Sequence, residues 1–352
     1  MSPDVHVWAQ WMGRMILEGH YLETVEGLFF AVKGWVHPPD RYIACLRYIP
    51  CGSESERRKG NIGYCRLYEW AEQESFLQES YPHYVSPDPV FHRILQSVPL
   101  RNVQQIYDPR NRLEELRLAG ERDSVEEDAL RFASLLIEET GIEWKYLGIS
   151  GSLLIGLYTP RSDLDLVVYG SGNSWAVYRA LQALRTAGGP VEYLGEDDLA
   201  ALYEERRAST FATREAYALR ERAKAMQGRF RGRPYFIRFL KDAANLDERY
   251  GDRVYIPLGQ AAIEATVADA RESIFTPCCY RVKAVRILEG PVVDGLTEII
   301  SYRGRFCEQA REGDRVRALG TLERVKDAGG NIWHQLILGN SDADFLLPEE
   351  RE

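Results

Sequence analysis

The chain has 352 residues, enough for two or three domains with apolar cores, and a net charge of −9. That charge argues against a protein that coats nucleic acid indiscriminately, although it leaves room for a local basic groove. The sequence has no run of 18 apolar residues, and its first residues do not form a signal peptide. We therefore expect a soluble, cytoplasmic protein without a membrane partner.

Residues 1–120 are predicted to form a separate α+β module. Apolar and polar residues alternate from Arg14 to Tyr48 in short runs broken by Gly27 and Gly34. Such a pattern is typical of a small antiparallel sheet. The module shows no catalytic pattern.

The six cysteines include no Cys-x-x-Cys motif, and no histidine completes a usual zinc spacing with them. Most are expected to be small buried thiols. A disulfide among Cys45, Cys51 and Cys65 would be admissible in a protein from a hyperthermophile, and the sequence does not decide it.

A helix is predicted to follow the N-terminal module. Ser124 would be its N-cap, with Glu127 reaching back in a capping box, and Gly141 would end it. A strand at 145–149 comes next and leads into the most informative segment of the chain.

That segment joins two predicted strands. Gly151 and Ser152 end the first strand, and Asp163 and Asp165 alternate with leucine at the start of the second. Side chains two residues apart share a face of a strand, so the two carboxylates are expected to lie close together in an open cleft. Two such carboxylates repel each other unless a cation lies between them, and Mg²⁺ prefers oxygen ligands of this kind.

This arrangement resembles the signature of the DNA polymerase β-like nucleotidyltransferase superfamily, in which an apolar strand, Gly-Ser, a short helix and an Asp-apolar-Asp strand follow one another. Gly151, Ser152, Asp163 and Asp165 match it position by position. The resemblance implies an α+β fold with a mixed-sheet core. It also implies that Asp163 and Asp165 are catalytic and bind Mg²⁺ or Mn²⁺, and that Gly151, Ser152 and Ser162 bind the nucleotide.

The superfamily pattern has a third carboxylate on a later strand, which this sequence does not supply in its expected place. The matching strand is residues 234–241, where the expected position holds Phe236. The sequence does not choose between two alternatives, Asp242, just past that strand, and Glu192. We take Asp242 as the candidate third metal ligand. Because the third carboxylate normally helps to accept a proton from the attacking hydroxyl, its absence bears on activity more than on fold.

The stretch from Arg206 to Lys241 is strongly basic, with eleven Lys or Arg residues and two Glu residues. It forms either a solvated surface with internal ion pairs to the acidic residues just upstream, at 196–198 and 204–205, or a surface that binds the phosphates of a nucleotide or polynucleotide. Under the second interpretation, Arg229, Arg231, Arg233 and Arg238 are the expected nucleic-acid contacts.

Residues 261–347 are rich in predicted strands, and the segment 313–331 is typical of a strand pair in an OB-like small barrel. Such barrels often bind single-stranded nucleic acid, although a purely structural barrel has the same pattern. The expected organisation is an N-terminal α+β module at 1–120, a nucleotidyltransferase domain at 121–255 and a C-terminal OB-like β-barrel at 256–352.

We expect a metal-dependent nucleotidyltransferase that moves a nucleoside monophosphate from an NTP to an acceptor, a polynucleotide such as RNA, and releases pyrophosphate. The alternative is a catalytically weak or inactive protein of the same fold that binds RNA or a protein partner. The sequence does not fix which NTP is used, which acceptor, or the oligomeric state.

Overall fold

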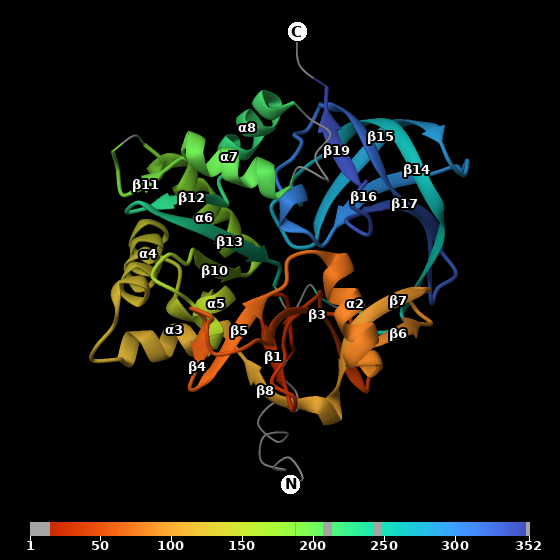
Figure 1. Ribbon diagram of the computed structural model, residues 1–352. Helices are drawn as coiled ribbons and strands as arrows, with labels where there is room; N and C mark the ends of the chain where they lie inside the picture. The colour runs from red at the N-terminus through yellow and green to blue at the C-terminus, as the bar shows by residue number, and fades with distance from the viewer. Residues whose placement is uncertain (1–14, 187, 207–212, 243–245, 247, 350–352) are drawn as a thin grey trace. The chain divides into compact units, whose positions relative to one another are not determined.

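The computed structural model describes residues 15–186, 188–206, 213–242, 246 and 248–349. In this part of the chain the fold is α+β, as the sequence predicts, with three sheets and the helices α2 to α8 (Figure 1). None of the described helices is long and apolar enough to cross a membrane.

The residues pack into two compact units. Unit 1 comprises Met1–Asp88, Ile94–Ala180 and Phe230–Tyr250, and unit 2 comprises Pro89–Arg93, Leu181–Arg229 and Gly251–Glu352. Unit 1 thus joins most of the N-terminal module to segments of the expected nucleotidyltransferase domain. The domain boundaries at 120/121 and 255/256 stay predictions.

The N-terminal residues of unit 1 form an antiparallel sheet, as the alternation of apolar and polar residues predicts. Its main path is β4-β5-β3-β2-β1-β8, with β7 pairing β3 and β6 pairing β7. One face packs Leu22, Phe30 and Leu46 with Leu77 of helix α2 (Trp70–Ser80). The strands are β1 (Tyr21–Thr24), β2 (Phe29–Val32), β3 (Arg41–Pro50), β4 (Arg58–Lys59), β5 (Ile62–Arg66), β6 (Val85–Asp88), β7 (Arg93–Pro99) and β8 (Val103–Tyr107).

A disulfide joins Cys51 and Cys65, whose Cα atoms are 5.6 Å apart and 14 residues apart in the chain. It connects the residue after β3 to β5, the strand that pairs with β3. Of the three cysteines for which the sequence leaves a disulfide open, Cys45 is half-buried and takes no part in this disulfide.

Helix α4 (Ser124–Thr140) is capped one residue earlier than the sequence predicts. Asp123 is the N-cap, and Glu126 completes the capping box in place of Glu127. Asp and Ser are both good N-caps, but a carboxylate also interacts with the positive end of the helix dipole. Gly141 ends the helix as predicted, in a left-handed conformation with φ of 71°.

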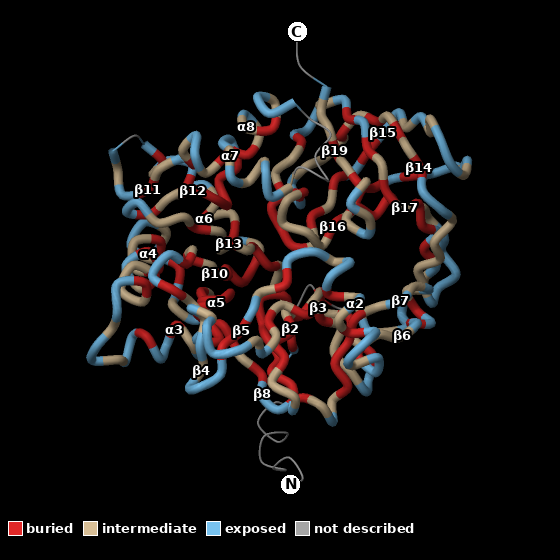
Figure 2. Tube along the Cα trace, in the orientation of Figure 1, coloured by how far each residue is buried: buried red, intermediate tan, exposed pale blue. Residues whose placement is uncertain are grey.

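The second sheet of unit 1 is centred on β10 (Leu164–Tyr169), in which buried residues predominate (Figure 2). This strand runs antiparallel to β9 (Leu147–Ile149) and parallel to β13 (Arg233–Leu240). The short helix α5 (Gly151–Ile155) connects β9 to β10, and α6 (Ser171–Leu184) follows β10. The order strand, short helix, strand, helix is the one that the sequence predicts. Helix α3 (Pro109–Leu118) precedes α4.

Unit 2 holds β11 (Val191–Glu192), the helices α7 (Glu196–Glu205) and α8 (Arg214–Ala223), and most of β12 (Gln227–Phe230). In the C-terminal sheet the pairing runs β14-β15-β16-β18-β17, and β17 also pairs with β14, so five strands close into a ring. The pair β16–β18 is parallel, and β19 adds to β17. These strands are β14 (Arg253–Asp269), β15 (Cys278–Glu289), β16 (Leu296–Ser301), β17 (Arg315–Asp327), β18 (Ile332–Leu338) and β19 (Phe345–Pro348).

Candidate active site

Asp163 and Asp165 lie at the start of β10, where the alternation of the strand separates them from their leucine neighbours. Leu164 and Leu166 are fully buried, whereas both aspartates are half-buried. Because alternate residues of a strand share a face, the two carboxylates are on one side of β10. The strand geometry agrees with the sequence prediction.

Gly151 brings the two halves of the motif together. The N–H of Ser150 donates a hydrogen bond of 2.8 Å to the backbone oxygen of Asp165. Gly151 has a φ of +60°, and a Cβ atom added to it would lie 1.8 Å from Oδ2 of Asp165. Only glycine fits this close approach without displacing the carboxylate. The Gly-Ser turn and the paired aspartates are therefore one site.

Ser152 and Ser162 are buried at this turn, close to the aspartates in the chain but bonded to each other. Their hydroxyl oxygens are 3.4 Å apart, and the Ser162 hydroxyl also accepts a 2.9 Å hydrogen bond from the N–H of Thr159. These hydrogen bonds hold the loop between α5 and β10 in place. The nucleotide-binding role assigned to Gly151, Ser152 and Ser162 stays a prediction.

The electrostatics of the pair is unusual. Burial, and then the negative charge of Asp163, raise the pKa of Asp165 from 3.8 to about 7, while Arg66, Arg238 and Arg47 oppose the rise. Neither carboxylate hydrogen-bonds to or ion-pairs with any other side chain among the described residues. A bound cation would relieve this repulsion directly.

The donor set fits Mg²⁺ only in part. Among the described residues no group of three or more His, Cys, Asp or Glu side chains is arranged to hold a metal ion. Mg²⁺ usually binds one or two carboxylates and completes its coordination shell with water and substrate phosphates. Two aspartates therefore supply enough protein ligands of the right chemical type. Asp163 and Asp165 are the residues that would hold it.

The expected third carboxylate is not beside the pair. Phe236 of β13 is in register with Asp165, at the position where the superfamily pattern has its acid. Asp242 lies past the opposite end of β13, where its Oδ2 accepts a 3.0 Å hydrogen bond from the N–H of Ser171 at the start of α6. Asp242 is six positions after Phe236 and two past the end of β13, which in an extended chain spans roughly 20 Å. The structure therefore does not bring Asp242 to the paired aspartates, because it caps α6 instead.

Glu192, the other alternative, belongs to unit 2 on strand β11. Its Oε1 accepts a 2.9 Å hydrogen bond from the N–H of Gly188. This bond closes the local turn before β11 and gives the side chain a structural role there.

An acid that the sequence reasoning missed contacts an arginine of the site. Glu18, which is buried, is 3.4 Å from the guanidinium of Arg238 and 3.4 Å from Nζ of Lys33, and it accepts a hydrogen bond from the N–H of Gly34. Arg238 shares a face of the sheet with Asp165, because parallel strands in register align their faces. Glu18 thus fixes an arginine beside the paired aspartates.

The N-terminal sheet also reaches the site. Its second face packs against α5 and the residues after it, in a cluster made of Tyr21, Phe29, Tyr48, Tyr64, Leu154, Ile155 and Leu157. No local sequence pattern predicts this contact, because about ninety residues separate Tyr64 of β5 from Leu154 of α5. The N-terminal module is therefore part of the surroundings of the motif.

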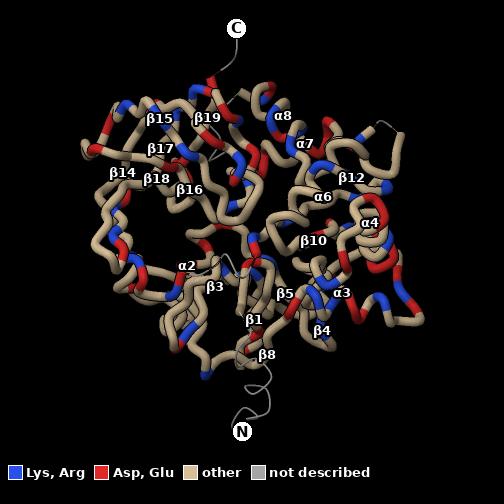
Figure 3. The backbone as a smooth tube through the Cα atoms, turned by 180° about the vertical axis from the view of Figure 1, so that it is seen from behind, with Lys and Arg blue, Asp and Glu red and all other residues tan. Residues whose placement is uncertain are grey.

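The arginines expected to bind nucleic acid have acidic partners. Arg229 forms an ion pair of 2.6 Å with Asp198, one of the upstream acids. Arg231 and Arg233 both pair with Asp128, at 3.6 and 3.1 Å. Basic and acidic residues are interspersed along the described chain (Figure 3). These pairs match the interpretation of the basic stretch as internally paired.

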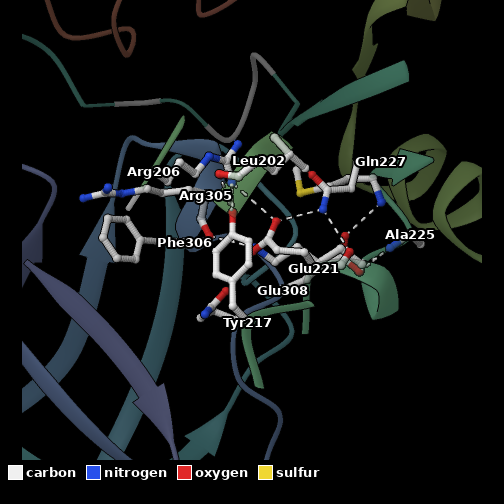
Figure 4. Close-up of polar contacts among 12 residues, drawn as sticks. Leu202, Arg206, Tyr217, Glu221, Ala225, Gln227, Arg305, Phe306 and Glu308 are labelled. Atoms are coloured by element: carbon white, nitrogen blue, oxygen red, sulfur yellow. Dashed lines mark hydrogen bonds and ion pairs between the residues drawn. The ribbon is translucent and has the colours of Figure 1, made fainter. Parts of the chain in front are cut away.

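Two further cations of the stretch are inside unit 2. The buried carboxylate of Glu221 is 2.6 Å from Nζ of Lys224 and 3.4 Å from the guanidinium of Arg206, and the amide of Gln227 donates to it (Figure 4). Lys224 also donates a 2.7 Å hydrogen bond to the backbone oxygen of Arg305. This network links the end of α8 to the segment between β16 and β17, which gives these side chains a structural role. Arg207, another member of the stretch, lies outside the described residues.

Comparison with known proteins gives a match over most of the chain. The chain is 27% identical over 334 residues to an uncharacterised protein of Methanocaldococcus jannaschii, and the match covers 92% of this chain and 96% of that protein. No protein family matches the chain, and no solved structure does. The similarity extends over both units, and it carries no information about activity.

Proposed function

We propose that the chain is a metal-dependent nucleotidyltransferase of the polymerase β-like type, which transfers a nucleoside monophosphate from an NTP to an acceptor and releases pyrophosphate. The observation that carries the proposal is the contact of Gly151 with Asp165. It joins the Gly-Ser turn to two carboxylates that repel each other and that have no partner among the described side chains. The arrangement of β9, α5, β10 and β13 suits the compact mixed sheet of that superfamily.

In this proposal Asp163 and Asp165 hold Mg²⁺ or Mn²⁺ through their carboxylate oxygens. The metal would supply charge neutralisation at the α-phosphate and orient the attacking hydroxyl. Gly151 allows the backbone to approach Asp165 and, with Ser152 and Ser162, shapes the turn expected to bind the nucleotide. Arg238, fixed by Glu18, adds positive charge on the same face of the sheet.

A polynucleotide, RNA in particular, is the acceptor that we propose to test first. Its support is the C-terminal ring of five strands, whose order β14-β15-β16-β18-β17 with closure back to β14 suits an OB-like barrel. The ion pairs of Arg229, Arg231 and Arg233 weaken that support, since arginines with acidic partners are less free to follow a phosphate backbone.

One observation favours the second candidate, a catalytically weak or inactive protein that binds RNA or a protein partner. Phe236 occupies the position of the third acid, and Glu18, which contacts Arg238 on the same face of the sheet, is engaged in ion pairs. Among the described residues we therefore assign no carboxylate that would accept a proton from an attacking hydroxyl. The reaction rate of an enzyme without that group would be about 10²–10⁴-fold lower.

The deciding experiment incubates the purified protein with each labelled NTP and Mg²⁺ or Mn²⁺, with and without total RNA. Label transferred to RNA or to the protein, and lost in the variant Asp163→Asn with Asp165→Asn, would support the enzyme. The variant Glu79→Gln on the exposed end of α2 serves as the matched control. NTP binding that needs a divalent metal but gives no transfer would favour the second candidate.

A further inference from the structure

Arg66, at the end of β5, is an arginine near the paired aspartates whose side chain lacks a carboxylate partner among the described residues. Its guanidinium lies over the ring of Tyr68, with Cζ 4.3 Å from the ring centroid. Its Nε is buried and unbonded, and within the described part of the chain its side chain makes no hydrogen bond or ion pair. Asp163 is near enough to interact with it electrostatically. Burying an arginine in this state is costly unless a ligand supplies the acceptor.

Arg47, on the neighbouring strand β3, is a second such group. Phe29 pairs with Tyr48 and Phe30 pairs with Leu46, so Arg47 is the extra residue of a β-bulge. Bulges of this kind re-aim a side chain and are common beside active sites. The half-buried Arg47 side chain has no hydrogen bond or ion pair among the described residues, and its charge acts on Asp165.

These two arginines are on the face of the N-terminal sheet that packs against the motif. Tyr48 lies directly opposite Arg66 in the pairing of β3 with β5, so the two side chains share a face. Tyr48 is itself packed in the cluster with Leu154 and Ile155 of α5. The backbone register therefore turns Arg66 towards the same side as the Gly-Ser helix.

We propose that Arg47 and Arg66 bind the phosphate groups of the substrate beside Asp163 and Asp165, so that the N-terminal module forms one half of the active site. Two guanidiniums and two carboxylates lie within electrostatic range of each other, and none of the four has a hydrogen bond or an ion pair to another described side chain. A polyphosphate with a divalent cation matches this arrangement of charges. The guanidiniums take phosphate oxygens, and the carboxylates take the cation. The inference rests on the proposed function in that the polyphosphate is that of an NTP.

The test uses inorganic tripolyphosphate, titrated calorimetrically into the full chain in the presence of EDTA. Arg47→Met and Arg66→Met keep most of the apolar stem and remove the charge. Each is expected to weaken tripolyphosphate binding about ten- to hundredfold, the range for a lost charge-assisted hydrogen bond. Arg101→Met, at an exposed arginine of the same module, is the charge-matched control and should bind like wild type.

The aspartate variants separate this inference from the proposed function. Without metal, Asp163→Asn with Asp165→Asn should bind tripolyphosphate as tightly as wild type or more tightly, because two negative charges are removed. If these aspartate variants lose metal-dependent ATP binding while Arg47→Met and Arg66→Met bind tripolyphosphate normally, the phosphate role of the arginines is wrong and the nucleotidyltransferase proposal stands. The opposite outcome is that Arg47→Met and Arg66→Met lose tripolyphosphate binding while the aspartate variants still bind ATP with metal normally. The arginines then bind phosphate as inferred, and the nucleotidyltransferase proposal is wrong.

Two further measurements decide the outcomes that remain. A short RNA with 5′-hydroxyl ends carries only phosphodiesters, so binding of this RNA through Arg47 and Arg66 without binding of tripolyphosphate would overturn the assignment to the triphosphate. If Arg66→Met does not fold, Arg66→Lys keeps the charge but loses the planar fork of donors. Weaker tripolyphosphate binding by this variant, at an unchanged unfolding midpoint, would support the inference, and unchanged binding would overturn it.

Discussion

Replacing Asp165 by asparagine is expected to stabilise the metal-free protein at alkaline pH. Burial and the charge of Asp163 raise the pKa of Asp165 to about 7, above the value of 3.8 for an unperturbed carboxyl. The folded protein therefore holds a proton that the unfolded chain releases as the pH rises from about 4 to about 7. Stability falls through this window for wild type, because the ionised form is disfavoured in the fold. Asparagine has the same shape and no charge to lose.

The size of the effect follows from the two pKa values. Moving from 3.8 to about 7 corresponds to up to about 4 kcal/mol, at about 1.4 kcal/mol per pKa unit. The variant and wild type should have nearly equal free energies of unfolding at pH 4, and the difference should grow to between about 1 and 4 kcal/mol at pH 8. Arg66, Arg238 and Arg47 already reduce the cost.

Urea unfolding with EDTA at several pH values between 4 and 8 measures this directly. Glu79→Gln, on the exposed part of helix α2, should show no such trend. Added Mg²⁺ at pH 8 should raise the unfolding midpoint of wild type and leave that of Asp165→Asn almost unchanged. An asparagine variant that is less stable than wild type at pH 8 would mean that Asp165 has a partner that favours its charge, and the electrostatic argument for a cation site would fail.

Three other substitutions test separate parts of the structure. Gly151→Ala should lower the free energy of unfolding by about 1–2 kcal/mol from the left-handed backbone alone. It should also abolish metal-dependent NTP binding, because the methyl group displaces the Asp165 carboxylate. A variant that binds NTP normally would show that the turn at Gly151 is not part of the binding site. Phe236→Asp places a carboxylate in register with Asp165 and should tighten Mg²⁺ binding about tenfold or more. Titration calorimetry measures this affinity, and an unchanged value would show that residue 236 of β13 does not face the metal. Cys51→Ser opens a 14-residue loop and should cost about 3 kcal/mol, which a comparison of urea unfolding with and without reductant checks against wild type.

The centre of the candidate site was predictable because its signals are local. Strand alternation places Asp163 and Asp165 on one face, and a glycine before a short helix predicts a tight turn. The position of Phe236 came instead from matching residues 234–241 to the superfamily pattern, and the pairing of β13 with β10 places it in register with Asp165. The α4 cap was misplaced by one residue because Asp123 and Ser124 are both good N-caps, and propensity alone does not rank two neighbours.

The parts that sequence reasoning missed depend on long-range contacts. Arg47 and Arg66 acquire significance only when the N-terminal sheet packs against α5, and no spacing rule connects residues so far apart. Conversely, the charge of Arg231 and Arg233 suggested a phosphate surface, because nothing in the local sequence shows that Asp128, about a hundred residues earlier, neutralises them. Net charge over a stretch is thus a weak guide to what its side chains face.

The packing of the N-terminal sheet against α5 has a consequence during protein synthesis. The aromatic face formed by Tyr21, Phe29, Tyr48 and Tyr64 leaves the ribosome well before Leu154 and Ile155, which cover it in the finished protein. At roughly 5–20 residues per second, the ninety or so residues between Tyr64 and Leu154 take roughly 5–20 s to synthesise. During that time the nascent chain exposes an aromatic, aggregation-prone surface. Truncation after residue 120 should therefore yield a fragment that aggregates or recruits chaperones.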